Sequence, residues 1–266
     1  MTEASQTRFL SDSHFHSTAM RDRDLNPKEI LGAFRDEYAG PLLDVAIQPE
    51  DSARQRQLSG AISGVYYSCG LHPSRTDRED WHTALQMVER QISDGGYHAV
   101  GETGLDWYRM YAPRDRQREL FHHHLVLSRR LNLPVIVHNR EADQDVLEML
   151  RAADLSTMGV MHCFSSKPEW VHRFLDVGMY ISFAGNLTFK NAQPLREAAQ
   201  LVPDDRLLVE TDAPFLAPDP VRGRPNHPGY LSHTVQRVAD VRNTTPERIG
   251  ELVAENLARM IGVSVT

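Results

Sequence analysis

The order of apolar segments along the 266 residues predicts an α/β protein whose parallel sheet closes into a (β/α)8 TIM-type barrel, distorted in places and completed by C-terminal helices. Eight short apolar runs, many rich in β-branched residues, alternate with stretches of helical periodicity. Eight such units in about 260 residues match a closed barrel. An open doubly wound sheet is the alternative, but no Gly-x-Gly-x-x-Gly motif follows the first run, which weakens it.

The expected strands cover residues 8–14, 42–47, 62–68, 98–102, 134–137, 158–162, 179–183 and 206–211. The expected helices cover residues 27–38, 81–92, 114–131, 146–150, 170–175, 195–201, 232–240 and 246–261. Thr245 can cap the last helix, and Pro246 suits its first position, where a missing N–H costs nothing. Residues 213–230 hold five prolines and should form a long loop over one barrel end. No linker or repeat is visible, so we expect one domain over residues 1–266.

Charge and composition limit the classes of protein that fit. The net charge of −7 argues against a protein that coats nucleic acid with a broad basic surface, but it allows an enzyme that binds a few phosphates. No apolar run reaches 18 residues, and residues 1–10 lack the basic start and apolar stretch of a signal peptide. We therefore expect a cytoplasmic protein without membrane association. Cys69 and Cys163 are too few for a disulfide framework and are expected to be small buried side chains.

His14 and His16 stand at the end of the first expected strand. Side chains alternate between the two faces of a strand, so both imidazoles point the same way and can reach one divalent ion. An isolated His-x-His pair is more often two polar residues where an edge strand meets solvent. The remainder of the chain must decide between these two interpretations.

Further residues of ligand type fall at the carboxyl ends of later strands, where active sites of such barrels lie. Successive candidates are 86, 36, 24 and 50 residues apart, which are about three, one, one and two βα units. The full set is His14, His16, Glu102, His138, His162 and Asp212. Four histidines and two carboxylates exceed what one ion needs when water must also bind, but they suit two ions bridged by Glu102. Such a pair would activate a shared water, and this indicates a hydrolase.

Six segments at these strand ends carry a resemblance to a known family. They are residues 12–16, 70–73, 101–106, 134–138, 162–165 and 210–214, with the sequences DSHFH, GLHP, GETGLD, PVIVH, HCFS and ETDAP. Their order and content resemble the TatD-like metal-dependent deoxyribonucleases of the amidohydrolase superfamily over almost the whole chain. The motifs are specific together, although each alone would be weak.

The resemblance implies hydrolysis of DNA phosphodiester bonds from strand ends by a metal-activated hydroxide at a two-metal site. By this resemblance His14, His16 and Asp212 hold one ion, His138 and His162 hold the other, Glu102 bridges the two and Asp212 is the general base. Magnesium or manganese would serve in function, while imidazole-rich sites also suit zinc or nickel. DNA is the expected partner, and we expect a monomer without an obligate protein partner.

Three further residues are candidates for contacts with substrate. His72 follows the third strand and fits a donor to a substrate phosphate, with a purely structural histidine as the alternative. Glu210 lies two residues before Asp212 and faces inward with it, where it could tune the site or pair with an arginine lower in the barrel. Arg140 lies near a strand end and could meet the phosphate backbone.

Several features leave the substrate open. Thr103 replaces an aliphatic residue of the family motif, and His227 stands where an acidic residue is more usual. A barrel of the same class acting on a small phosphodiester, an amide or a lactone is the main alternative, although many of those carry a carboxylated lysine where this chain has Glu102. A non-enzymatic binding platform is the second alternative. Four aromatic residues near the barrel mouth are candidates for stacking on bases: Phe164, Phe183, Phe189 and Phe215. Three consecutive histidines, His122, His123 and His124, are expected on a solvated helix face.

Overall fold

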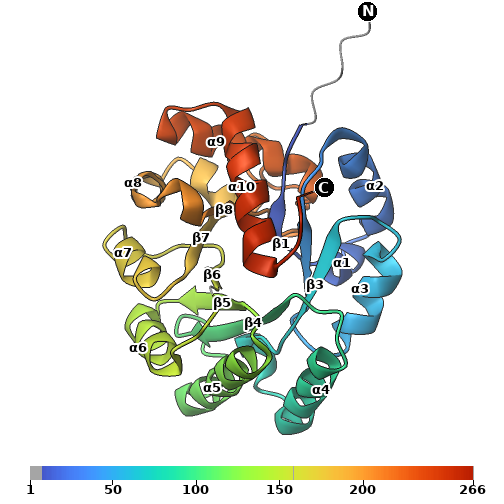
Figure 1. The fold of residues 1–266 in the computed structure, drawn as a ribbon, viewed down its shortest axis with the longest axis vertical. Helices are drawn as coiled ribbons and strands as arrows, with labels where there is room; N and C mark the ends of the chain where they lie inside the picture. The colour runs from blue at the N-terminus through green and yellow to red at the C-terminus, as the bar shows by residue number, and fades with distance from the viewer. Residues whose placement is uncertain (1–7, 158, 266) are drawn as a thin grey trace, which may run out of the picture.

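Eight parallel strands follow one another around a barrel in the computed structural model, which describes residues 8–157 and 159–265 (Figure 1). Neighbouring strands pair in sequence order from β1 to β8, so the predicted (β/α)8 barrel is confirmed. The strands are β1 (Asp12–Phe15), β2 (Leu42–Val45), β3 (Val65–Cys69), β4 (Ala99–Asp106), β5 (Val135–Arg140), β6 (Val160–Met161), β7 (Tyr180–Phe183) and β8 (Leu207–Val209).

Helices surround the strands, and Figure 1 shows them as an outer layer around the barrel. They are α1 (Ser17–Arg21), α2 (Pro27–Glu37), α3 (Asp51–Ser59), α4 (Trp81–Ser93), α5 (Arg114–Leu131), α6 (Asp143–Ala153), α7 (Trp170–Leu175), α8 (Gln193–Leu201), α9 (Leu231–Arg242) and α10 (Pro246–Ile261). Within the described ranges, none of these helices has both the length and the apolar character needed to span a bilayer. Residues 1–7, which form most of the segment tested for a signal peptide, lie outside the described part.

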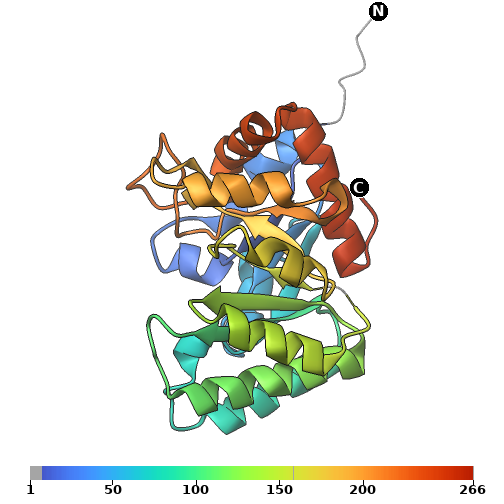
Figure 2. The same ribbon diagram turned by 90° about the vertical axis from the view of Figure 1, so that its left-hand side faces the viewer.

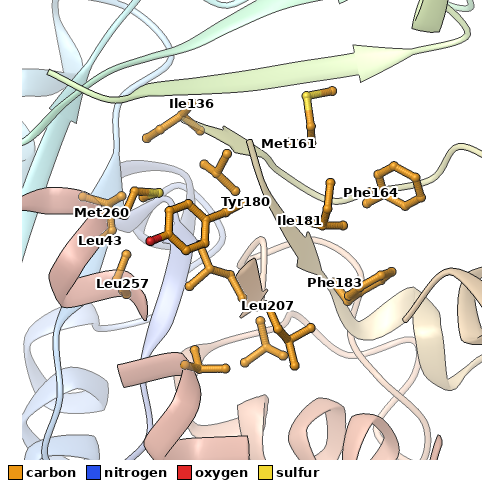
Figure 3. Packing of buried hydrophobic residues seen from close by; sticks show 14 of the residues in the cluster. Leu43, Ile136, Met161, Phe164, Tyr180, Ile181, Phe183, Leu207, Leu257 and Met260 are labelled. Atoms are coloured by element: carbon orange, nitrogen blue, oxygen red, sulfur yellow. The ribbon is translucent and has the colours of Figure 1, made fainter. Parts of the chain in front are cut away.

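The last helix closes the barrel at the end where the strands begin. Leu257 and Met260 of α10 lie beside Tyr180 of β7 and Leu43 of β2 in a buried layer that is apolar except for the Tyr180 hydroxyl (Figure 3). As predicted, Thr245 caps this helix by accepting a hydrogen bond from the Arg248 N–H at 3.2 Å. The lower barrel is therefore a packed core, and chemistry is left to the opposite end.

The barrel closes between β1 and β8 through a side chain as well as the backbone. The buried Asp12 carboxylate accepts hydrogen bonds from the Thr211 N–H at 2.9 Å and the Thr211 hydroxyl at 2.6 Å. Burial raises the pKa of Asp12 to about 7 despite these hydrogen bonds. Above this pair, the Asp212 N–H donates to the His14 carbonyl at 2.9 Å. The seam thus places two candidate ligands from opposite ends of the chain side by side.

Helix α3 was missed by the sequence prediction because it docks through polar groups. Its sequence has almost no apolar stripe, and its buried face consists of polar residues, two of which bond to the buried Asp44. The Gln55 amide donates to the Asp44 carbonyl at 2.9 Å, and the Ser59 hydroxyl donates to the carboxylate at 2.9 Å. Helical periodicity of apolar residues cannot reveal such a helix.

Strand limits also differ from those expected. Strand β1 begins at Asp12 rather than at residue 8, because Phe9 makes only an isolated bridge to Ala39. His14 lies within β1 and not at its end, because the strand continues to Phe15. Glu102 and His138 likewise lie inside β4 and β5, which run on to Asp106 and Arg140. Strand β6 has only two residues, and Met158, the expected start of this strand, lies outside the described residues. The alternation of strands and helices is right even where individual limits are not.

Candidate metal centre

The six predicted ligands converge at the carboxyl end of the barrel. In Figure 2 the green arrow of β5 points left, toward the side where the orange loop after β8 projects. The residues meeting there come from β1, β4 and β5 and from the chain just after β1, β6 and β8: His14, His16, Glu102, His138, His162 and Asp212. These six residues therefore form one cluster, as their spacing in the sequence predicts.

One side of the cluster is built by β1 and the end of β8, and is called here the β1/β8 side. The Nε2 atoms of His14 and His16 are 3.1 Å apart, and the His16 Nε2 is 3.3 Å from Asp212 Oδ1. The His14 Nε2 is also 3.4 Å from Glu102 Oε2. Four donors bonded to one ion at about 2.1 Å would stand roughly 3.4 Å from one another in a tetrahedron. These distances suit a shared cation.

The other side, built by the ends of β3 to β6, is called here the β3/β6 side. It gathers around the second oxygen of Glu102, Oε1. That atom is 2.9 Å from His162 Nε2, 3.1 Å from His138 Nδ1 and 3.3 Å from His72 Nε2. Burial raises the pKa of Glu102, but the surrounding histidines outweigh it and hold that pKa well below the usual range. Glu102 is thus an anion whose two oxygens face two different groups of imidazoles.

Hydrogen bonds behind the rings decide which nitrogen is free to bind an ion. The Nδ1 of His16 is 2.8 Å from the Val45 carbonyl, so in the neutral ring Nδ1 carries the proton and Nε2 presents a lone pair. The Nδ1 of His162 is likewise 3.1 Å from the Glu210 carboxylate, which leaves its Nε2 as an acceptor facing Glu102. The Nε2 lone pairs of these neutral rings face carboxylate oxygens, and two such acceptors can lie this close only with a positive charge between them. A metal ion would supply that charge.

His72 has the opposite arrangement. Its Nδ1 accepts a hydrogen bond from the Ser74 N–H at 3.0 Å, so the neutral ring carries its proton on Nε2. That Nε2–H points at Glu102 Oε1. His72, Glu102 and His138 lie close enough together to share an ion, but this tautomer favours a hydrogen-bond donor over a metal ligand. The predicted role toward a substrate phosphate stays a prediction.

Protonation of the histidines follows from the carboxylates around them. Burial lowers the pKa of His16, but Asp212 and Glu102 outweigh it and raise that pKa to about 9. Glu102 and Glu210 raise the pKa of His162 well above its ordinary value, again against burial. A divalent ion would replace these protons and meet the same excess of negative charge.

Two carboxylates support the ligands from behind, and the sequence revealed only one of them. Glu210 is fully buried and holds both His162 Nδ1 and the Cys163 N–H, the latter at 2.8 Å, with no arginine pair among the described residues. Asp106 lies 3.3 Å from His138 Nε2 and was not predicted. Its signal was its position four residues after Glu102, which places both on one face of β4.

A glycine allows β4 and β5 to approach closely beside the site. Gly104 has φ +138°, and an added Cβ would overlap the His138 carbonyl oxygen. Only glycine fits this position, which brings Glu102 and Asp106 within reach of His138.

Some predicted features lie elsewhere. His124 is completely buried, accepting the Leu71 N–H at Nε2 (3.1 Å), so the solvated face expected for all three helix histidines was wrong for this one. Phe164 and Phe183 are buried in the barrel core and cannot stack bases (Figure 3). Cys69 is buried as expected, and burial raises its pKa to about 12. Cys163 is half-buried beside Glu210 and departs from the expectation.

The two departures from the family motif do not contact a metal ligand by any hydrogen bond among the described residues. Thr103 is buried in β4 and its hydroxyl has no partner in the described structure. The His227 ring lies 3.8 Å from the ring of Tyr230 in the long loop after β8. Arg140 lies over Tyr108, with Cζ 4.3 Å from the ring centre, at the rim of the site.

A parallel barrel with buried histidines and carboxylates at its carboxyl end defines a hydrolase with a candidate metal centre. The family model described as "TatD related DNase" matches residues 11–262, and the chain therefore belongs to this family of metal-dependent hydrolases. It is 37% identical over 262 residues to an uncharacterized metal-dependent hydrolase, YcfH, of Escherichia coli K12, covering 97% of each chain.

The chain is also similar to a protein named as an exonuclease and to a TatD homologue with a crystal structure. The chain is 31% identical over 234 residues to a protein of Rahnella named 3'-5' ssDNA/RNA exonuclease TatD, covering 85% of this chain and 88% of that protein. The crystal structure of YjjV, a TatD homologue from Escherichia coli K12, superposes with a TM-score of 0.84 at 25% identity, covering 96% of this chain and 98% of that one.

Proposed function

We propose that the protein is a divalent-metal-dependent nuclease that hydrolyses DNA phosphodiester bonds from strand ends at a centre of two ions. The observation that carries the proposal is Glu102, whose two oxygens each face a separate group of imidazoles at 2.9–3.8 Å. The family match and the exonuclease named among the relatives support the choice of substrate. Magnesium or manganese suits phosphoryl transfer, and the donor set also accepts zinc or nickel.

When bound, the ions would supply the positive charge that lowers the pKa of a water and neutralises a phosphate oxygen. Asp212 is the carboxylate best placed to take the proton. Its side chain keeps 14% of its surface exposed, against 4% for Glu102, so water and substrate can reach it. Burial raises the pKa of Asp212, but His16, His162 and His14 together lower it, and the group is ionised at neutral pH. The His72 Nε2–H, 3.3 Å from Glu102 Oε1 in this structure, would donate to a phosphate oxygen once an ion takes up that carboxylate oxygen.

The decisive experiment uses purified protein that has been chelated and then reloaded with one metal at a time. End-labelled single- and double-stranded DNA, a small phosphodiester and a lactone are offered in parallel. We expect nucleotide release from DNA ends only with a divalent ion. Turnover of the lactone without DNA cleavage would instead establish the alternative barrel hydrolase.

Asp212→Asn tests the mechanism within the same assay. We expect hydrolysis to fall by at least about a hundredfold, since removing a general base typically costs 10²–10⁴ in rate. Asp205→Asn is the matched control, because this exposed aspartate pairs with Arg206 at the opposite end of the barrel. Circular dichroism should show an intact fold in both variants. Undiminished activity of Asp212→Asn would refute this role.

The monomeric state and the cytoplasmic location of the protein stay predictions.

A further inference from the structure

Two exposed aromatic rings flank the candidate metal centre from opposite sides of the barrel mouth. Tyr108 follows β4 directly, and its N–H donates to Asp106, the carboxylate that lies 3.3 Å from His138. Phe215 follows Asp212 by three residues, and its ring centre is 6.2 Å from that of His16. Figure 1 places β4 on the lower side of the barrel and β1 and β8 on the upper side.

Both rings are exposed although large apolar side chains are normally buried. Tyr108 is 55% exposed and Phe215 is 40% exposed. Neither is needed to fill the core, and each adjoins a residue that contacts the metal ligands. Exposed aromatics beside a catalytic centre are suited to contacts with a flat ligand.

An arginine lies over each ring. The Cζ of Arg140 is 4.3 Å from the centre of Tyr108, and the Cζ of Arg23 is 4.9 Å from the centre of Phe215. Neither guanidinium forms an ion pair with any carboxylate in the described ranges. Some arginines elsewhere are paired, as Arg54 is with Asp22 at 2.7 Å. Each of the two guanidinium groups at the mouth instead lies over an aromatic ring, and both can donate to an anion such as a phosphate.

We propose that Tyr108 with Arg140 and Phe215 with Arg23 form two platforms that each stack one unpaired base and hold an adjacent phosphate, so that single-stranded nucleic acid is bound across the metal centre. This inference rests on the proposed nuclease function and adds its substrate-binding residues. Bases in a duplex already cover each other's faces, so two separate platforms require unpaired bases. Every base has a flat face, and binding by stacking therefore selects strandedness and not sequence.

The test combines changes in the protein with changes in the substrate. Wild type, Tyr108→Ala and Phe215→Ala are assayed on single-stranded oligonucleotides that are intact or carry one abasic site beside the terminal phosphodiester. We expect each variant to raise KM for the intact strand roughly 5- to 100-fold, the range measured for loss of one base–aromatic stack. The abasic site should weaken binding to wild type but add little in the variant whose platform it faces.

Conservative variants separate stacking from folding. Tyr108→Phe and Phe215→Tyr keep the ring and should restore KM to near the wild-type value. Tyr38→Ala is the matched control, because Arg8 also lies over this tyrosine, at 4.9 Å, but at the end where α2 meets β2. Preference for single strands over duplex should shrink in Tyr108→Ala and Phe215→Ala alone.

The outcomes distinguish this inference from the proposed function. If wild type cleaves DNA but both alanine variants keep the wild-type KM, or if ring loss and base loss are fully additive, the platforms are refuted and the nuclease stands. If wild type hydrolyses no nucleic acid with any divalent ion, both are refuted together. Raised KM with non-additive base loss supports the platforms.

Discussion

The two sides of the candidate metal centre are held in different ways. On the β1/β8 side a backbone carbonyl, that of Val45, holds the His16 ring, while the buried His14 Nδ1 has no partner in the described structure. On the β3/β6 side carboxylates do this work, with Asp106 behind His138 and Glu210 behind His162. A carboxylate behind an imidazole makes it a more basic and better oriented ligand. The β3/β6 side is therefore ordered before an ion arrives, whereas the β1/β8 side carries the more exposed Asp212.

The largest effect is expected from the residue that both sides share. Glu102→Gln removes the negative charge that faces five imidazoles, so both sides should lose affinity for divalent ions. We expect hydrolysis to fall about a thousandfold or more, which corresponds to roughly 4 kcal/mol in the barrier. Metal content and rate are measured together, with Glu89→Gln, an exposed pair to Arg130, as control. Activity above a tenth of the wild-type rate would show that Glu102 is not needed for ion binding on both sides.

Removing the carboxylates behind the rings should weaken one side only. Glu210→Gln and Asp106→Asn are each expected to lower divalent-ion affinity about 10- to 100-fold, the usual range for such supporting partners. Glu210→Gln should have the larger effect, because Glu210 is fully buried and also holds the Cys163 N–H. Titration of activity with manganese checks this, and excess ion should restore much of the rate. Two variants that bind the ion as wild type does would show that the carboxylates do not set affinity.

His72→Asn distinguishes a hydrogen-bond donor from a ligand. If His72 donates to a phosphate, the variant keeps its metal content, while KM rises about 10- to 100-fold, since hydrogen bonds to charged groups contribute about 1.5–3 kcal/mol. The Ser74 N–H that fixes the tautomer remains in place. Metal analysis beside steady-state kinetics separates the two roles, and loss of an ion from the variant would make His72 a ligand.

The smallest effect on hydrolysis is expected from a histidine that belongs to neither side, because it changes the stability of the fold and not the site. Burial lowers the pKa of His124 to about 4, while the unfolded chain titrates near 6.5. Between these values the unfolded state binds more protons, so the stability from this neutral ring is complete above about pH 6.5 and is lost as pH falls toward 4. The whole contribution is about 3 kcal/mol. Urea unfolding of wild type and His124→Gln at several pH values checks it. A difference in unfolding free energy between the two proteins that does not change with pH would contradict this account.

The cluster of six candidate ligands could be predicted because it depends on strand order and period. His138 and Asp212 were expected at strand ends without knowledge of any contact, and the structure brings both to the same end of the barrel. Of the two supporting carboxylates, Glu210 was a candidate from the sequence, but Asp106 was missed because its contact with His138 is polar and long-range. The spacing of Asp106 from Glu102 indicates a shared face of β4 but not a partner, and nothing local marks His124 as the acceptor for Leu71. Helix α3 escaped for the same reason, since it is buried through polar groups around Asp44.

The seam at Asp12 and Thr211 has a consequence for synthesis on the ribosome. Strand β1 emerges first, yet its partner Thr211 and the candidate ligand Asp212 emerge only after some 200 further residues. Glu210, which supports His162 on the β3/β6 side, emerges just two residues before Asp212. Neither side of the centre is therefore complete until the segment after β8 has closed against β1, and hydrolysis must wait for that step. A nascent chain that lacks the segment after β8 should therefore not hydrolyse its substrate.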